Sequence, residues 1–146
     1  VTAIYIAPES SAPMQRVDAV NAIAGRGLEG DRYADEKGTF STGEPHQHVT
    51  LIESEALDRA RTDYEIDFED HEPRRNIVTK GIALTHLVGS EFDIGDARFR
   101  AIRLSEPCGH VDKLAEKPLC KTLVHRCGLQ CEVISGGAIA VGAKVG

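Results

Sequence analysis

Cys108 is the residue whose type and neighbours best suit it for chemistry. It lies between Pro107 and Gly109, with Glu106 and His110 two positions away on either side. Proline fixes φ and glycine tolerates conformations that other residues avoid, so the Pro-Cys-Gly sequence predicts a turn that ends a strand. A thiol held on such a turn is accessible, and its thiolate can bind a soft metal or attack an electrophile.

The other three cysteines are expected to be packing residues. Cys120 and Cys127 fall on the apolar face of a helix predicted from Leu119 to Cys127, and Cys131 alternates with polar residues in a following strand. The chain has no CxxC pair, and its cysteine spacing matches no standard iron–sulfur pattern, which disfavours zinc and cluster sites. Three interpretations of Cys108 stay open: a metal ligand, a sulfur carrier, or the nucleophile of a hydrolase.

Two adjacent arginines, Arg74 and Arg75, lie at the entrance of a short strand predicted for Asn76 to Thr79. The planar fork of an arginine can hold a phosphate group through two parallel hydrogen bonds. Because neighbouring residues of a strand point to opposite faces, at most one of the two is expected to face a given pocket.

A glycine-rich loop, from Gly25 to Tyr33, carries Asp31 and Arg32. It lacks the Gly-Lys-Ser/Thr ending of a P-loop and the full dinucleotide-binding pattern, which favours a tight turn with a local ion pair. His46 and His48 are two positions apart and would share one face of a strand. Two histidines are too few for a zinc site, so a surface or supporting role is expected for them.

Length and composition indicate one domain, residues 1–146, with an ordinary balance of 41% apolar and 27% charged residues. The net charge of −6 argues against a nucleic-acid partner. Arginines and lysines gather in the second half of the chain, which fits a small anionic ligand better than a polyanion; a solvated sheet surface is the open alternative. No apolar run approaches the roughly 18 residues that span a bilayer, and the first residues do not form a signal peptide. We therefore expect a cytoplasmic protein with no membrane partner.

The hydrophobic pattern predicts a mostly β fold. Strands and hairpins are expected without the alternation of strands and helices that makes a parallel sheet, which favours an antiparallel β-barrel with two or three short helices. Gly95-Asp96 and Gly136-Gly137 are each expected to be the turn of a β-hairpin. The expected elements are strands at 1–7, 15–23, 48–52 and 76–79, hairpins at 91–104 and 129–142, and helices at 54–63 and 119–127.

Several short motifs in register resemble one family, the MOSC domain, named after the C-terminal part of molybdenum cofactor sulfurases. Each motif is weak alone, but their order along the chain is specific, and the resemblance covers nearly all of it from about Val17 onward. The motifs are GLEGDRY at 27–33, HVTLIESEAL at 48–57, PRRNIVTKGIAL at 73–84, EPCGH at 106–110 and the C-terminal segment RCGLQCEVISGGAIAVGAKV.

The resemblance implies a MOSC-type β-barrel in which Cys108 binds the molybdenum of a pterin cofactor, molybdopterin, or carries sulfur toward it. It implies cofactor-binding roles for the Arg74-Arg75-Asn76 motif, while Asp31 and Arg32 would line the same pocket. His48 matches a less uniform family position and is carried over with them.

Relatives of this kind include reductases of N-hydroxylated bases and amidoximes, so the resemblance implies a molybdenum-dependent oxidoreductase supplied with electrons by an external reductase. The alternative is a sulfur carrier that bears a persulfide on Cys108, with a cysteine desulfurase as its partner. Pyridoxal phosphate is not expected, because the desulfurase-like domain of the large sulfurases is lacking. The companion barrel of two-lobed relatives is lacking too, which leaves weak cofactor binding, completion of the site in a homodimer, or a carrier role.

Overall fold

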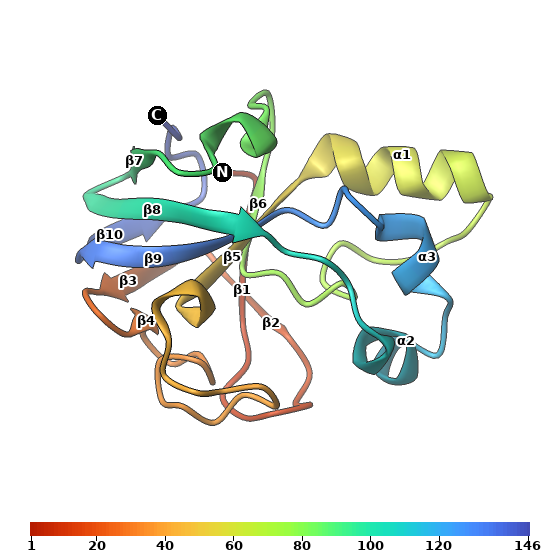
Figure 1. Cartoon of the computed structure of the whole chain (residues 1–146), viewed down its shortest axis with the longest axis horizontal. Coiled ribbons are helices and arrows are strands. Elements are labelled where there is room, and N and C mark those ends of the chain that lie inside the picture. Colours follow the sequence, from red (N-terminus) through yellow and green to blue (C-terminus); the bar gives the residue numbers. More distant parts are fainter.

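A computed structural model describes all residues, 1–146, as two β-sheets with three short helices gathered on one side (Figure 1). The larger sheet has seven strands in the order β2-β1-β6-β5-β9-β8-β7, and the smaller has the order β10-β3-β4. The strands are β1 Ala3–Ile6, β2 Gln15–Val17, β3 Ala19–Ile23, β4 Gly27–Leu28, β5 Val49–Glu53, β6 Ile77–Thr79, β7 Glu91–Ile94, β8 Ala97–Leu104, β9 Leu129–Ser135 and β10 Gly137–Ala140. The helices are α1 Ser54–Tyr64, α2 Gly109–Ala115 and α3 Leu119–Leu123, with 3₁₀ turns at Pro45–Gln47 and Leu84–Leu87.

The predicted mostly β architecture with short helices is confirmed, and the larger sheet curls into a half-barrel closed by the smaller one. All strand pairs are antiparallel except β5 and β6, which run parallel. Helix α1 fills the connection between those two strands, because a parallel pair needs a crossover rather than a tight turn. It ends at Glu65, whose left-handed backbone (φ +50°) stops the helix.

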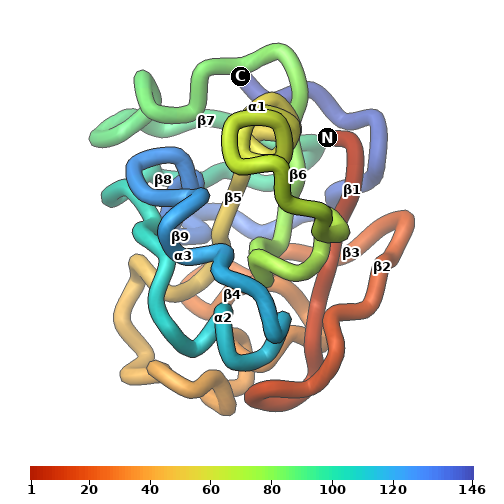
Figure 2. Tube along the Cα trace, turned by 90° about the vertical axis from the view of Figure 1, so that its right-hand side faces the viewer, coloured from red at the N-terminus to blue at the C-terminus, as the bar shows by residue number.

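Three central strands of the larger sheet are buried on both faces and therefore separate two hydrophobic cores. Along β5, Leu51 points into the core between the two sheets, while its neighbour Ile52 points into a second core under the helices. Strands β1 and β6 divide their side chains in the same way. Figure 2 shows the helical side of the molecule, with α2 and α3 next to each other below α1.

Most of the strands predicted from alternating apolar and polar residues are present in the structure. Phe99 and Val133 are buried partners across β8 and β9, and the turn at Gly95-Asp96 joins β7 to β8 as expected. Cys131 also points inward and is fully buried, as predicted. The expected strand at 15–23 is divided into β2 and β3, which belong to different sheets.

The hairpin predicted at Gly136-Gly137 is wrong. Strand β9 is already paired along both edges, by β5 and by β8, so β10 finds no free edge there and pairs with β3 instead. The two glycines lie where the backbones of the two sheets come close together. A Cβ atom at Gly136 would lie 2.7 Å from the carbonyl oxygen of Ala22, and one at Gly137 would lie 2.4 Å from that of Asp96.

The helix predicted from Leu119 to Cys127 is shorter than expected and ends at Leu123. Val124 already has an extended backbone (ψ 129°), and the following residues turn the chain toward β9. Helix α2, which begins directly after Cys108, was not predicted from the sequence. No helix of the structure combines the length and the apolar character needed to cross a membrane.

Candidate functional site

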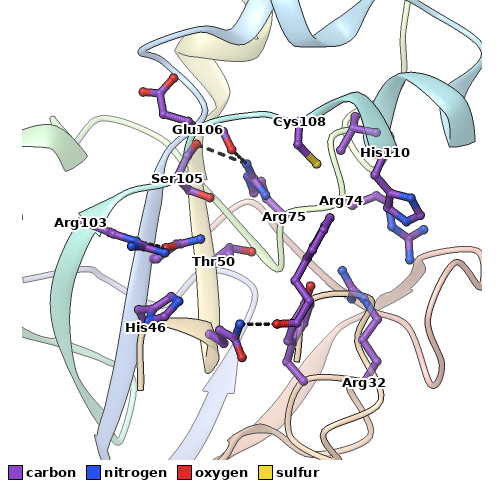
Figure 3. A pocket seen from close by; sticks show the side chains of 15 residues that line it. Arg32, His46, Thr50, Arg74, Arg75, Arg103, Ser105, Glu106, Cys108 and His110 are labelled. Atoms are coloured by element: carbon purple, nitrogen blue, oxygen red, sulfur yellow. Dashed lines mark hydrogen bonds between the residues drawn. The ribbon is translucent and has the colours of Figure 1, made fainter. Parts of the chain in front are cut away.

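A cavity of about 310 Å³ lies where the ends of several strands meet the loop before β5 (Figure 3). Its walls are unusually cationic for an acidic chain, because four arginines line it together with Cys108. The lining residues are Arg32, Tyr33, Phe40, His46, Gln47, Thr50, Arg74, Arg75, Arg103, Ser105, Glu106, Cys108, His110, Val111 and Gln130.

Cys108 occupies the turn that leads out of β8, and its thiol is exposed. Its backbone is extended (φ −133°, ψ 165°), and helix α2 begins at the next residue. Figure 3 shows the sulfur atom directed into the space that Arg74 and Arg75 also enter. Across the whole chain, no three His, Cys, Asp or Glu side chains gather as a metal site, so Cys108 would be a single protein ligand.

Arg74 is the buried cation of the pocket that has no carboxylate partner. Its Nη1 donates to the carbonyl oxygen of Ala12 at 2.7 Å, but its Nη2 is buried and has no hydrogen-bond partner. Burial, followed by the neighbouring charge of Arg32, lowers the pKa of Arg74 to about 10, and Asp31 opposes this only in part. A buried guanidinium with a free donor beside a second cation is electrostatically incomplete, and an anion in the pocket would complete it.

The expectation that at most one of Arg74 and Arg75 faces a pocket is wrong, since both line the cavity. Arg74 has a left-handed backbone (φ +62°) and precedes β6 rather than belonging to it. The alternation of a strand therefore does not apply to this pair. Such a conformation costs a non-glycine residue about 1–3 kcal/mol and is typical of functional sites.

Arg75 donates most of its hydrogen bonds to backbone carbonyl groups before and after the segment that carries Cys108. Its Nε donates to the carbonyl oxygen of Cys127 at 3.0 Å, and its Nη2 lies 3.3 Å from that of Ser105. The same Nη2 lies 2.9 Å from the Cys127 sulfur and 3.5 Å from the carbonyl oxygen of Glu106. Arg75 thus joins the chain before Cys108 to the chain after α3, and fewer of its donors remain for a ligand than sequence reasoning assumed.

Asp31 lies behind Arg32 and does not line the cavity. Its carboxylate is fully buried, accepts the backbone N–H groups of Ala7 and Tyr33, and lies 3.1 Å from Nη1 of Arg32. The glycine-rich loop therefore forms the expected ion pair, and this pair orients Arg32 along the cavity wall. Asp31 neutralises only one of the two buried guanidinium groups, because Arg74 has no carboxylate within bonding distance.

Asn76 and His48 likewise support the site without lining it. The Asn76 side chain accepts hydrogen bonds from the backbone and hydroxyl of Thr50 and donates to Tyr5, which fixes Thr50 at the cavity wall. The Nδ1 atom of His48 accepts the backbone N–H of Val133 at 3.1 Å. Burial lowers the pKa of His48, so the neutral ring that this bond requires is favoured.

Several lining residues were not singled out by the sequence. Arg103 donates to Gln130 at 2.6 Å across β8 and β9, and the hydroxyl of Ser105 is buried without a partner. At the mouth, exposed Phe40 makes an edge contact with His110, their ring centroids 5.9 Å apart. The only sequence signal for Arg103 was the excess of arginines in the second half of the chain. A pocket assembled from distant segments leaves no local pattern.

Cys120 departs from its predicted place in the core. It is half-buried, and its sulfur lies 3.6 Å from the carbonyl oxygen of Pro107. Cys127, by contrast, is buried as predicted.

The family comparison confirms the resemblance that the sequence motifs indicate. The MOSC domain family matches residues 39–146, so the chain belongs to the MOSC domain family.

Solved structures extend the likeness over nearly the whole chain. The YuaD protein from Bacillus subtilis superposes with a TM-score of 0.81 at 17% identity, covering 98% of this chain and 91% of that one. YiiM from Geobacillus stearothermophilus gives 0.76 at 16% identity, with 99% and 72% covered. YiiM from Escherichia coli gives 0.68 at 19% identity, with 98% and 66% covered. At these identities the likeness establishes the fold alone. No curated protein matches the sequence.

Proposed function

We propose that this MOSC protein binds the molybdenum cofactor in the pocket around Cys108 and reduces N-hydroxylated substrates with electrons from an external reductase. The observation that carries the proposal is a pocket shared by the exposed thiol of Cys108 and the buried guanidinium of Arg74, whose Nη2 has no hydrogen-bond partner. A metal carried on an anionic organic group needs both a soft ligand and a cationic cradle.

The residues of the pocket fit such a group. The free Nη2 of Arg74 and the unpartnered hydroxyl of Ser105 are buried donors without an acceptor in the protein. Arg32, held by Asp31, adds a second positive charge near Arg74. Phosphate oxygens are the acceptors that best match guanidinium donors. The lone thiolate of Cys108 also suits a cofactor that brings the remaining metal ligands with it.

Some residues of the pocket would bind the cofactor, and others would supply protons. Arg74 and Arg32 would hold the anionic end, and Cys108 would hold the metal. When bound, the cofactor would supply a metal centre that exchanges electrons in pairs, which reduction of an N–O bond requires. Converting an N-hydroxyl group to N–H also consumes two protons and releases water. His110 and Glu106 line the pocket near Cys108 and are suited to bring protons from solvent.

Elemental analysis together with an activity assay tests the proposal. Protein made in a cofactor-competent host is expected to contain molybdenum and to reduce an N-hydroxylated purine when a reductase and reduced nicotinamide are supplied. Cys108→Ser should lose both the metal and the activity, because a serine hydroxyl is a poor soft ligand.

Cys120→Ser is the matched control, since it removes a neighbouring thiol outside the pocket lining. Under reducing conditions it should keep both properties. Retained activity in Cys108→Ser, or molybdenum bound equally by both variants, would contradict the proposal.

A sulfur carrier is the second candidate, and the exposure of Cys108 favours it, because a donor enzyme must reach the thiol. It predicts that incubation with a cysteine desulfurase and cysteine adds one sulfur atom to Cys108, without turnover of N-hydroxylated substrates. The absence of any sulfur adduct on Cys108 by mass spectrometry would exclude this role. Either role is compatible with a homodimer that completes the pocket, which the mass of the protein in solution would test.

A further inference from the structure

A second thiol lies next to the cysteine turn and has no part in the proposed function. The Sγ atom of Cys120 lies 3.6 Å from the carbonyl oxygen of Pro107, the residue bonded to Cys108. Standard backbone dimensions place the Cα atom of Cys108 about 2.8 Å from that oxygen. The Cys120 sulfur is therefore at most roughly 6.4 Å from that Cα atom, so the two cysteines lie on adjoining segments of the chain.

The two short helices bring these thiols together. Helix α2 starts directly after Cys108, and α3 carries Cys120 in its first turn. A left-handed residue, Glu116 (φ +56°), reverses the chain between them, and the helices lie side by side (Figures 1 and 2). The carboxylate of Asp112 accepts the backbone N–H of Cys120 at 2.7 Å, which fixes the start of α3 against α2.

We propose that Cys108 and Cys120 form a reversible disulfide in the presence of peroxide, and that this bond removes the Cys108 thiol from the pocket. Cys108 is exposed and Cys120 is half-exposed, so an oxidant can reach the first and the second can reach the oxidised product. The bond requires the two side chains to rotate toward each other and the surface turn that carries Cys108 to shift.

The reaction balances with hydrogen peroxide as the oxidant. The Cys108 thiolate attacks one peroxide oxygen, the O–O bond breaks, and water leaves once a proton is added, which gives a sulfenic acid. The Cys120 thiol then attacks the Cys108 sulfur, the S–S bond forms, the S–O bond breaks and a second water leaves. Two electrons pass from the sulfur atoms to the peroxide, and a dithiol reverses the change.

The other two cysteines are unsuited to this role. Cys131 is fully buried in the core between the sheets, and burial raises its pKa to about 12. Cys127 is buried and its sulfur accepts a hydrogen bond from Arg75. Cys120 is therefore the partner that the structure offers to Cys108.

The consequence for activity rests on the proposed function, since a Cys108 in a disulfide can neither bind a metal nor carry sulfur. Formation of the bond itself does not depend on that proposal, because it needs only the polypeptide and peroxide. Peroxide would switch the site off and shield Cys108 from irreversible oxidation.

Peptide mapping of the metal-free protein tests the bond directly. Reduced protein is treated with hydrogen peroxide, blocked with N-ethylmaleimide and digested with trypsin without reduction. Cleavage after Arg103, Lys113 and Lys121 puts Cys108 in peptide 104–113 and Cys120 in peptide 114–121, because trypsin does not cut between Lys117 and Pro118. We expect these two peptides to be joined, lighter by two hydrogen atoms than their sum, and to separate with dithiothreitol.

Two variants complete the test. Cys120→Ser should give no linked peptides and should accumulate sulfinic acid on Cys108, whereas Cys131→Ala, which removes a core thiol, should still give the linked pair. A wild-type digest with sulfinic acid on Cys108 and no link to Cys120 would overturn the proposal, and so would a Cys108–Cys108 link between chains. If the link forms but the protein never binds molybdenum or sulfur, the disulfide stands and the proposed function fails.

Discussion

The Nη2 atom of Arg75 lies 2.9 Å from the sulfur of Cys127, which sits at the far side of the helical segment that follows Cys108. Burial raises the pKa of the Cys127 thiol, and the charge of Arg75 opposes that shift. Arg75 also donates to the carbonyl oxygens of Ser105 and Cys127. One guanidinium group therefore holds together the two ends of segment 105–127, which carries Cys108.

Removal of this guanidinium should therefore destabilise the fold. We expect Arg75→Ala to lower the free energy of unfolding by about 2–4 kcal/mol, because it leaves carbonyl groups in a partly buried place without donors. Urea unfolding measures the change. Arg75→Lys should recover only a small part, since an ammonium group cannot reach separated acceptors as a guanidinium does.

Arg100→Ala is the matched control for Arg75. Its side chain is exposed on β8 and pairs with Glu91 and Glu132 at the surface. Exposed ion pairs contribute at most about 1 kcal/mol. Equal losses of stability in Arg100→Ala and Arg75→Ala would show that Arg75 does not hold the two ends of segment 105–127 together.

Arg74 is expected to behave in the opposite way. Arg74→Met removes a buried charge with an unpartnered Nη2 and relieves repulsion from Arg32, so the free energy of unfolding should stay within about 1 kcal/mol or rise. Its affinity for inorganic phosphate should fall by about 10- to 100-fold, which corresponds to one charge-assisted hydrogen bond. Calorimetric titration with phosphate measures this.

Arg98→Met provides the comparison, because Arg98 pairs with Glu91 and Asp93 on the surface, outside the pocket. It should bind phosphate as the unchanged protein does. A loss of stability in Arg74→Met as large as that of Arg75→Ala would mean that Arg74 supports the fold rather than a ligand.

His48 should make stability depend on pH. Burial lowers its pKa in the folded state, so below the ordinary histidine value the unfolded chain binds more protons than the folded one. Stability should therefore fall as pH drops below about 6.5, by at most about 1.4 kcal/mol per pH unit, until the lower folded pKa is passed.

His48→Asn isolates this effect, since an amide oxygen can still accept the N–H of Val133 but does not titrate. Urea unfolding of both proteins at pH 7.5 and 5.5 should give a steeper loss for the unchanged protein. Parallel losses would assign the pH dependence to other groups.

Gly128 should tolerate no side chain. It has a left-handed backbone (φ +92°), and an added Cβ atom would lie 1.7 Å from the carbonyl oxygen of Leu51. We expect Gly128→Ala to cost more than about 4 kcal/mol in unfolding free energy. Gly25→Ala, at φ +73° with open space around it, should cost only about 1 kcal/mol, the cost of its backbone conformation alone. Similar costs at both positions would contradict the close approach.

The sequence predicts the strands and helices of this fold better than it predicts which strands pair. Alternation along β9 and the turn at Gly95-Asp96 are local signals, and both predictions are confirmed. The partner of β10 is not local, because it depends on which sheet edges are already occupied. Helix α2 was missed because only seven residues form it and Val111 alone among them is buried, which leaves no apolar stripe.

The same limit applies to the pocket. Cys108 and the two arginines stand in recognisable motifs, whereas Thr50 and Arg103 reach the cavity only through strand pairing. Local pattern also could not show that Asp31 lies behind the cavity wall instead of on it, since that depends on its bonds to Ala7.

The pairing of β3 with β10 constrains the order in which the molecule can be completed during synthesis. Residues 19–23 are made long before their partner strand, residues 137–140. Until then the inner face of the half-barrel lacks part of its cover, and pairing across such a sequence separation is slow. The core between the two sheets is therefore expected to close only after β10 has been made.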